Sequence, residues 1–476
     1  MNKHNAILVK RAGSLSALAA ALMLGGCMSF IPTYERPAAP VAPAYAPELM
    51  SAGSASAAAA ADIEWQRFFA DPRLKRLIEL SLANNRDLRV AILNIEQARA
   101  NYQIKRADQL PTVGAGLSAQ RQAGTTGGLV NVYSVGLQVS SYELDFFGRV
   151  RSLSQAALSQ YLSTEEARKT TQISLISGVA TSYIGMLADD ELLRVTQDSL
   201  KTREDSFRLT KLRFDNGASS EVDLRQAEQL LETAKVALAQ TQRQKALDEN
   251  ALTLLVGQPL PADLPAPLTL AQQQGVTDLP AGLPSDLLTR RPDVLAAEQQ
   301  LLAANANIGA ARAAFFPRIS LTANAGTAST ELSGLFKSGT FALTGTATLL
   351  QPIFDAGRNQ ANLDVAKVNK DIAIAQYEKA IQTAFREVSD SLAGRATLGE
   401  QLRAQAAVAN AAQVSFKLAD LRYKNGASSY FDVLDAQRTL FTAQQATVQT
   451  QALQVQNLVT LYKVLGGGWT EPAKTN

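Results

Sequence analysis

Four short segments of the chain alternate apolar and polar residues with the period of two that marks a β-strand. Within residues 133–140, apolar side chains at odd positions alternate with Ser, Gly and Gln. Residues 113–119, 319–325 and 341–349 alternate likewise. Each segment runs for about 10 residues, the length of a tilted strand that crosses a bilayer. The pattern predicts two pairs of strands, which either span a membrane or form a small antiparallel sheet of a soluble domain.

Two much longer segments predict helices. Residues 148–214 and 357–423 contain no Pro and are rich in helix formers. At ~1.5 Å per residue each would extend on the order of 100 Å, which is more than one globular domain needs. Returning helices are expected over 220–255 and 429–465, and apolar residues recur there every seven positions, as in a coiled coil. The repeat comprises Leu434, Phe441, Val448, Val455 and Tyr462 in one, and Leu224, Leu231, Leu238 and Leu252 in the other, where Lys245 interrupts it.

The chain contains an internal duplication. Residues 213–223 match residues 422–432 at an offset of 209, and the same offset pairs Gly257 with Gly466. Because such matches recur along the whole half, each half is one copy of a helix, two strands, a long helix and a return helix. The expected division is a first repeat over 63–257 with strands at about 112–142, a Pro-rich linker over 258–292, a second repeat over 293–466 with strands at about 318–350, and a tail over 467–476.

The turns between long and returning helices repeat one local sequence. Gly217 and Gly426, each preceded by Asn, supply the positive φ that ends a helix. In each copy a Ser is followed three residues later by an Asp, so the Ser can cap the next helix and the Asp can meet its dipole. Each half is therefore expected to end in a tight helical hairpin.

The N-terminus is typical of an exported bacterial lipoprotein. A basic start and the apolar run 15–24 precede Leu-Gly-Gly and Cys27, which predicts a signal over 1–26 and a lipidated Cys27. Met28 comes directly after the cysteine, and in the usual sorting pattern a residue other than Asp there directs the anchor to the outer membrane. The Pro- and Ala-rich residues up to 62 are interpreted as an extended tether over 27–62.

Composition argues against several classes of function. Removing the signal leaves 43 basic and 43 acidic residues, which argues against a nucleic-acid partner. The only His, His4, lies in the signal, so Ser-His-Asp catalysis and His/Cys zinc sites are excluded and no cofactor beyond the lipid is expected. An enzyme built on carboxylate pairs or Ser-Lys stays open.

Four strands alone cannot close a barrel, and lipid does not tolerate unpaired strand edges. Two chains would supply eight strands around a side-chain-filled interior, whereas three would supply twelve around an open lumen. The favoured fold class is therefore an α+β membrane protein, a homotrimer with a 12-stranded transmembrane β-barrel continued by a long α-helical coiled-coil barrel.

Four motifs give the chain a resemblance to the TolC-like outer-membrane efflux factors, in their lipid-anchored OprM-type branch. They are YELDFFGR (142–149), AARAAFFPRISLTANAG (310–326), PIFDAGR (352–358) and DVLDAQR (432–438). The resemblance implies a trimeric exit duct in the outer membrane that serves multidrug efflux. It also implies two protein partners, a periplasmic adaptor and an inner-membrane RND-type transporter.

The same resemblance places a periplasmic gate at the hairpin ends. It implies carboxylate rings at Asp432 and Asp435 and a cross-hairpin ion pair of Arg438. The remaining gate candidates are the apolar constriction Phe431, the contact residue Tyr423 and the first-repeat acid Asp223. Ser428 stands where the TolC branch carries an Arg, so that latch is absent. On the residues alone, Asp223 and Asp432 are helix caps, and Asp435 and Arg438 form a solvated surface ion pair. The aromatic residues Phe431 and Tyr423 then belong to the helix seam.

Two other functions compete with the duct. A trimeric coiled-coil lipoprotein, acting as an envelope spacer or adhesin, would explain the helices but has no use for four strands of spanning length. A lipid-anchored hydrolase is disfavoured by the missing His. The sequence therefore favours the duct, and selectivity for the cargo is expected to belong to the transporter.

Overall fold

The structure is a computed structural model that describes residues 29–46, 60–123, 127–273, 279–280 and 286–469. The signal and Cys27 lie outside these residues. The chain divides into two compact units, which are described separately. The first unit contains residues 1–38, 94–165 and 296–378, and the second contains 39–93, 166–295 and 379–476.

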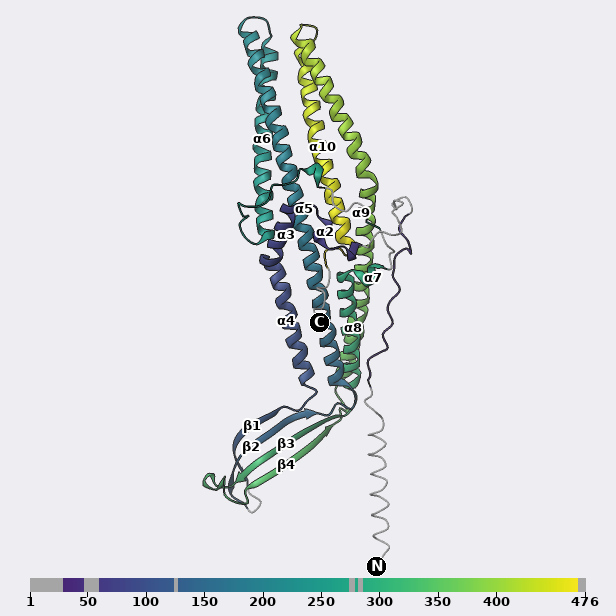
Figure 1. The fold of residues 1–476 in the computed structure, drawn as a ribbon. Coiled ribbons are helices and arrows are strands. Elements are labelled where there is room, and N and C mark those ends of the chain that lie inside the picture. Colours follow the sequence, from purple (N-terminus) through teal and green to yellow (C-terminus); the bar gives the residue numbers. More distant parts are fainter. Residues whose placement is uncertain (1–28, 47–59, 124–126, 274–278, 281–285, 470–476) are drawn as a thin grey trace, which may run out of the picture. The chain divides into compact units, whose positions relative to one another are not determined.

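The element order repeats once along the chain (Figure 1). The first copy contains α3 (Pro72–Asn84), α4 (Arg86–Ala107), β1 (Val113–Ala123), β2 (Leu129–Glu143), α5 (Arg149–Asp215) and α6 (Glu221–Val256). The second contains α8 (Pro292–Ala313), β3 (Arg318–Ser329), β4 (Phe341–Leu350), α9 (Arg358–Lys424) and α10 (Tyr430–Val464). Short helices α2 (Trp65–Phe68) and α7 (Leu287–Arg290) precede the two copies. Both long helices begin one residue after their predicted starts.

The first unit holds one antiparallel sheet with the strand order β1-β2-β3-β4. Side chains that share a row share a face of the sheet, and the row of Ala115, Leu137, Ala325 and Leu343 is apolar. Leu137 and Leu343 are 57% and 74% exposed in the single chain. The outer edges of β1 and β4 have no strand partner in the described chain. The sheet therefore leaves both an apolar face and two edges to be covered by something outside one protomer.

Two glycines allow the central strands to pair closely. Gly136 of β2 lies opposite Gly326 of β3. A Cβ atom on either residue would overlap the backbone of the opposite strand. Neither position therefore accepts another residue without a shift of the strands.

Residues 29–38 of the N-terminal segment are bound to the first unit rather than free. Phe30 stacks on Phe316 with 4.6 Å between ring centroids. The Arg36 guanidinium donates to both carboxylate oxygens of Glu298 on α8, at 2.7 and 2.9 Å. Composition predicts only an extended tether over 27–62. A Pro-rich segment without a core of its own carries no sequence signal for such contacts.

The second unit is built on the four long helices. α5 and α6 form one hairpin and α9 and α10 the other (Figure 1). The seam predicted from the seven-residue repeat is buried at Leu434, Val448 and Tyr462, which are 2%, 6% and 2% exposed. Among the described residues, no helix combines the length and the apolar character needed to cross a membrane.

Candidate functional site

The two hairpin turns have the same backbone geometry. Gly217 and Gly426 adopt φ values of +73° and +71°. In each turn, the amide of the residue after Gly donates to the carbonyl of the residue five positions earlier, at 2.7 Å in the first hairpin and 2.8 Å in the second. The preceding Asn side chain in each copy donates back to a helix carbonyl. These bonds satisfy the last carbonyls of α5 and α9, so the turns end both helices as the sequence indicates.

The first hairpin uses its Asp as part of a helix cap. The Ser220 hydroxyl accepts a bond from the Asp223 amide at 3.1 Å. The Asp223 carboxylate in turn accepts from the amide and hydroxyl of Ser220 at 3.2 and 2.8 Å, and from the Ser219 hydroxyl at 3.2 Å. This is a reciprocal capping box. The Asp223 carboxylate is thus engaged in holding the start of α6.

The second hairpin has the same Ser-x-x-Asp sequence but lacks that cap. Ser429 is the N-cap residue of α10 and makes no side-chain capping bond. Within the described chain, the carboxylate of Asp432 forms no hydrogen bond or ion pair. The expectation of a side-chain cap is therefore wrong for the second copy. Tyr430, the first residue of α10, is 5% exposed, whereas its repeat counterpart Glu221 is exposed.

A packed apolar cluster lies directly behind the turns. Its buried members are Ala227, Leu230, Tyr430, Val433 and Leu434. Tyr423 packs against it, with its ring centroid 5.1 Å from that of Tyr430, and the Arg213 guanidinium carbon lies 4.5 Å from the Tyr423 ring centroid. Tyr423 therefore joins the end of α9 to both α10 and α5, which is a contact role within one chain.

The remaining predicted gate residues share the exposed side of α10. Phe431 is 59% exposed, and Asp432, Asp435 and Arg438 are exposed too. Other pairs at i,i+3 form ion pairs, but none joins Asp435 to Arg438 in the described chain. One protomer therefore presents two carboxylates and one guanidinium without an intrachain partner. Such groups are available to a neighbouring chain.

The two repeats also differ farther from the turns. In the first, buried Asp189 of α5 interacts with Asp248 of α6, and Asp190 pairs with Lys245 at 2.5 Å. Burial, followed by the hydrogen bond and charge of Asp248, raises the pKa of Asp189 to about 7. The Asp189 carboxyl group therefore keeps its proton to a higher pH than an ordinary Asp.

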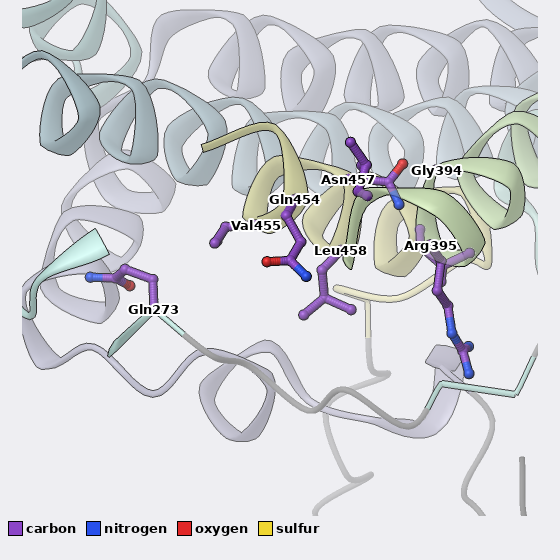
Figure 2. A pocket seen from close by; sticks show the side chains of 9 residues that line it. Gln273, Gly394, Arg395, Gln454, Val455, Asn457 and Leu458 are labelled. Carbon is purple, nitrogen blue, oxygen red and sulfur yellow. The ribbon is translucent and has the colours of Figure 1, made fainter. Parts of the chain in front are cut away.

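At the equivalent place in the second repeat the structure has a cavity of about 260 Å³. The offset of 209 places Leu398 and Asn457 where the first repeat has the two carboxyl groups. Figure 2 shows Leu458 and Gln454 of α10 at this cavity, with Arg395 of α9 on another side. The Asn457 amide donates to the Ser391 carbonyl at 2.9 Å, so this counterpart is neutral and bonded.

Sequence reasoning missed Asp189, Asp248 and Arg203. Arg203 is 4% exposed and contacts Leu230 of one hairpin and Phe441 of the other. The duplication contained a signal for it, because its counterpart at the same offset is Ala412. Where a charged residue in one repeat is equivalent to a small apolar residue in the other, the two copies have different environments at that position.

The geometry is that of an oligomeric membrane protein. Its sheet needs partners to close, and its second helical hairpin exposes charges that have no partner in the described chain. Comparison with known proteins identifies the family. Residues 77–258 and 283–467 match the family described as Outer membrane efflux protein.

Curated relatives cover almost the whole chain. The antibiotic efflux pump outer membrane protein ArpC and the toluene efflux pump outer membrane protein TtgC, both of Pseudomonas putida, are each 50% identical over 470 residues, covering 96% of both chains. Among solved structures, the open state of the Neisseria gonorrhoeae MtrE outer membrane channel superposes with a TM-score of 0.84 at 42% identity, covering 93% of this chain and 98% of that one.

The chain belongs to the outer membrane efflux protein family. It is an outer-membrane channel that serves as the exit duct of an efflux pump. Its protomers assemble as trimers, so the four strands of each chain contribute to a 12-stranded barrel that is continued by the long helices. Trimerisation supplies the missing partners of the β1 and β4 edges. The relatives are transport channels, which makes the alternative of a spacer or adhesin wrong.

Proposed function

We propose that the exposed charges of α10 form the periplasmic gate of this exit duct. The observation that carries the proposal is that Asp432, Asp435 and Arg438 have no intrachain partner in the described chain, whereas Asp223 is bound in its cap. In a trimer, three copies of Asp432 and Asp435 would surround one axis and make a negative aperture. Arg438 of one protomer would pair with a carboxylate of its neighbour and hold the hairpins together.

The closed state of the gate would then be held by three weak ion pairs, one at each contact between protomers. An exposed ion pair contributes about 0.2–1 kcal/mol, so the loss of one in each of three protomers shifts the closed–open equilibrium by a factor of about 3 to 150. Phe431, 59% exposed beside Asp432, would narrow the same aperture with an apolar side chain. Tyr423 and the cluster behind it would anchor the hairpin ends.

The test is single-channel conductance of the purified trimer in a planar bilayer. Asp435→Ala and Arg438→Ala should each raise the open probability or the size of the conductance steps. Glu232→Ala, which removes an exposed carboxylate of α6 that pairs with Lys235, is the matched control and should behave as wild type. Identical traces for all four proteins would assign the Asp435 and Arg438 side chains to ordinary solvated surface.

The proposal includes the rest of the pump. A periplasmic adaptor would contact the hairpin ends and an inner-membrane RND-type transporter would supply the energy, as the resemblance to the OprM-type branch implies. The cargo would be antibiotics and apolar solvents, because relatives that are 50% identical are named for antibiotic and toluene efflux. Expression in a strain that lacks its own channel should restore tolerance to both compounds, and failure with an intact trimer would exclude this cargo.

The membrane anchor is part of the same proposal. Lipid on Cys27 would hold the N-terminus at the outer membrane, and the contact of Phe30 with Phe316 would fix the adjoining segment. Mass spectrometry of the membrane-extracted protein should find an acylated Cys27 at the N-terminus. An unmodified chain beginning at Met1 would contradict the anchor but leave the channel intact.

A further inference from the structure

The guanidinium of Arg203 is buried between the hairpins without a counter-ion in the described chain. The side chain is 4% exposed, and its Nη1 donates to the Leu230 carbonyl of α6 at 3.2 Å. Its Nε has no hydrogen-bond partner, and the guanidinium forms no ion pair with any described residue. Buried charges in proteins are normally paired, because an uncompensated one is strongly destabilising. The structure therefore leaves room for an anion beside Arg203.

The groups nearest to Arg203 do not neutralise its charge. The Phe441 ring of α10 lies 5.2 Å from the guanidinium carbon, a cation–π contact that only partly replaces water. Burial lowers the pKa of Arg203, and the charge of Arg438 lowers it further. Two guanidinium groups, neither of which has an ion-pair partner in the described chain, thus act on the same small region, which attracts an anion.

A cavity of about 210 Å³ lies at this position and is lined by α5, α9 and α10. Its polar lining consists mainly of neutral donors, namely Ser199, Thr202, Gln413 and Gln444. The one carboxylate in the lining, Asp198, is already bound by Arg194 at 3.3 Å. Gln437 donates to the Ser206 hydroxyl, while its Oε1 is buried without a partner. The cavity therefore offers a strong donor at Arg203 and an acceptor at Gln437.

We propose that this cavity binds a single oxyanion of the phosphate class. Hydrogen phosphate matches both groups, since its charged oxygens accept from Arg203 and its hydroxyl donates to Gln437 Oε1. The ligand would join α5 and α6 to α9 and α10 and so stabilise the packing of the two hairpins. Binding does not depend on the proposed gate; only an effect of the ligand on conductance would rest on it.

The duplication shows that this constellation is specific to one place. At the offset of 209, Arg203 corresponds to Ala412 and Phe441 corresponds to Glu232. The second copy therefore has neither the buried cation nor the aromatic ring that contacts it. A protomer would bind one such ion, and a trimer three.

The test is a thermal-melting titration of the full-length trimer with inorganic phosphate up to about 10 mM at constant ionic strength. A ligand that binds only the folded state raises the melting midpoint, here by about 2–4 °C at saturation. Arg203→Met should abolish the rise. Arg208→Met, which removes an 81%-exposed arginine of the same helix, is the matched control and should respond as wild type. A flat wild-type titration, or an undiminished response of Arg203→Met, would overturn the proposal.

A second variant keeps the test independent of folding defects. Gln437→Glu places a carboxylate of the same size in the cavity, where it can pair with Arg203. It should melt at a higher temperature than wild type without phosphate, and phosphate should no longer stabilise it. A Gln437→Glu trimer that still responds like wild type would contradict the assigned position of the ion.

The source of the phosphate is resolved by repeating the titration with glycerol phosphate and with acetate. A response to glycerol phosphate would show that the cavity accepts a phosphate monoester such as a lipid headgroup carries, and a response to inorganic phosphate alone would assign a free ion. Either result supports the site. A response to acetate but to neither phosphate would overturn the assigned ligand class.

Discussion

In the first hairpin the Asp223 carboxylate accepts three hydrogen bonds, whereas in the second hairpin the equivalent Asp432 accepts none within the described chain. The local sequences differ at four of eleven positions, and one of these is the first residue of the next helix. Glu221 is exposed at the start of α6, while Tyr430 is buried at the start of α10. In the first copy Asp223 is therefore part of a helix cap, whereas in the second copy Asp432 is exposed.

The same divergence recurs away from the turns. The first repeat has a carboxyl pair, Asp189 with Asp248, where the second has Leu398 and Asn457 beside a cavity. A duplicated fold requires the same backbone in both copies, but it does not require the same polar groups. The two halves therefore contribute different chemistry to one channel, and substitutions at equivalent positions should have unequal effects.

The largest expected effect concerns the cluster behind the turns. Leu434 is 2% exposed, and its counterpart at the offset of 209 is Arg225, which is 64% exposed. Leu434→Ala should lower the free energy of unfolding by about 2–4 kcal/mol, because it leaves a cavity in a packed seam. Arg225→Ala should change it by less than about 0.5 kcal/mol. Denaturant unfolding of both variants measures the contrast, and equal losses would show that the two copies pack alike.

A smaller effect concerns the carboxyl pair. The raised pKa of Asp189 means that the folded state binds its proton more tightly than the unfolded state. Its contribution is therefore complete below the ordinary pKa of an Asp, about 4, and is lost as the pH rises through about 7. The melting midpoint of wild type should fall over about pH 5–8 relative to that of a variant that carries the second-repeat residues, Asp189→Leu with Asp248→Asn.

The composition of the chain simplifies the comparison between wild type and this variant, because few other groups titrate in the same pH range. The sequence contains a single His, His4, so no other side chain has an ordinary pKa close to 7. If the wild-type and variant midpoints run parallel over this pH range, the pKa of Asp189 is not raised in the folded state.

The smallest expected effect on stability concerns the two caps. Ser220→Ala removes a side chain that accepts from a helix amide and should cost about 1 kcal/mol. Ser429→Ala removes a side chain without a capping bond and should cost less than about 0.5 kcal/mol. Chemical denaturation of the two variants provides the measurement. A larger loss for Ser429→Ala would show that the second copy is capped after all.

The sequence predicted the features that depend on neighbouring residues. Pro-free segments predicted α5 and α9, and an Asn-Gly pair predicted the end of each. The trimeric barrel was also predicted, because strand number and open edges limit how a sheet can close. These features need only local propensity, periodicity and simple geometry.

The sequence did not predict features that depend on residues brought together by the fold. The Ser-x-x-Asp pattern is present twice, yet it forms the side-chain cap in the first hairpin and not in the second. Asp189 and Asp248 lie on different helices, and no local pattern connects them. The gate residues were named through family resemblance, and their roles stay predictions.

The most direct test of the account compares the two equivalent acids in one assay. Asp432→Asn and Asp223→Asn trimers are measured beside wild type for single-channel conductance in a planar bilayer and for melting temperature. Asp432→Asn should raise the conductance or the open probability and leave the melting temperature unchanged. Asp223→Asn should lower the melting temperature with little change in conductance. If the two variants behave alike, the division of roles between the first and second hairpins is contradicted.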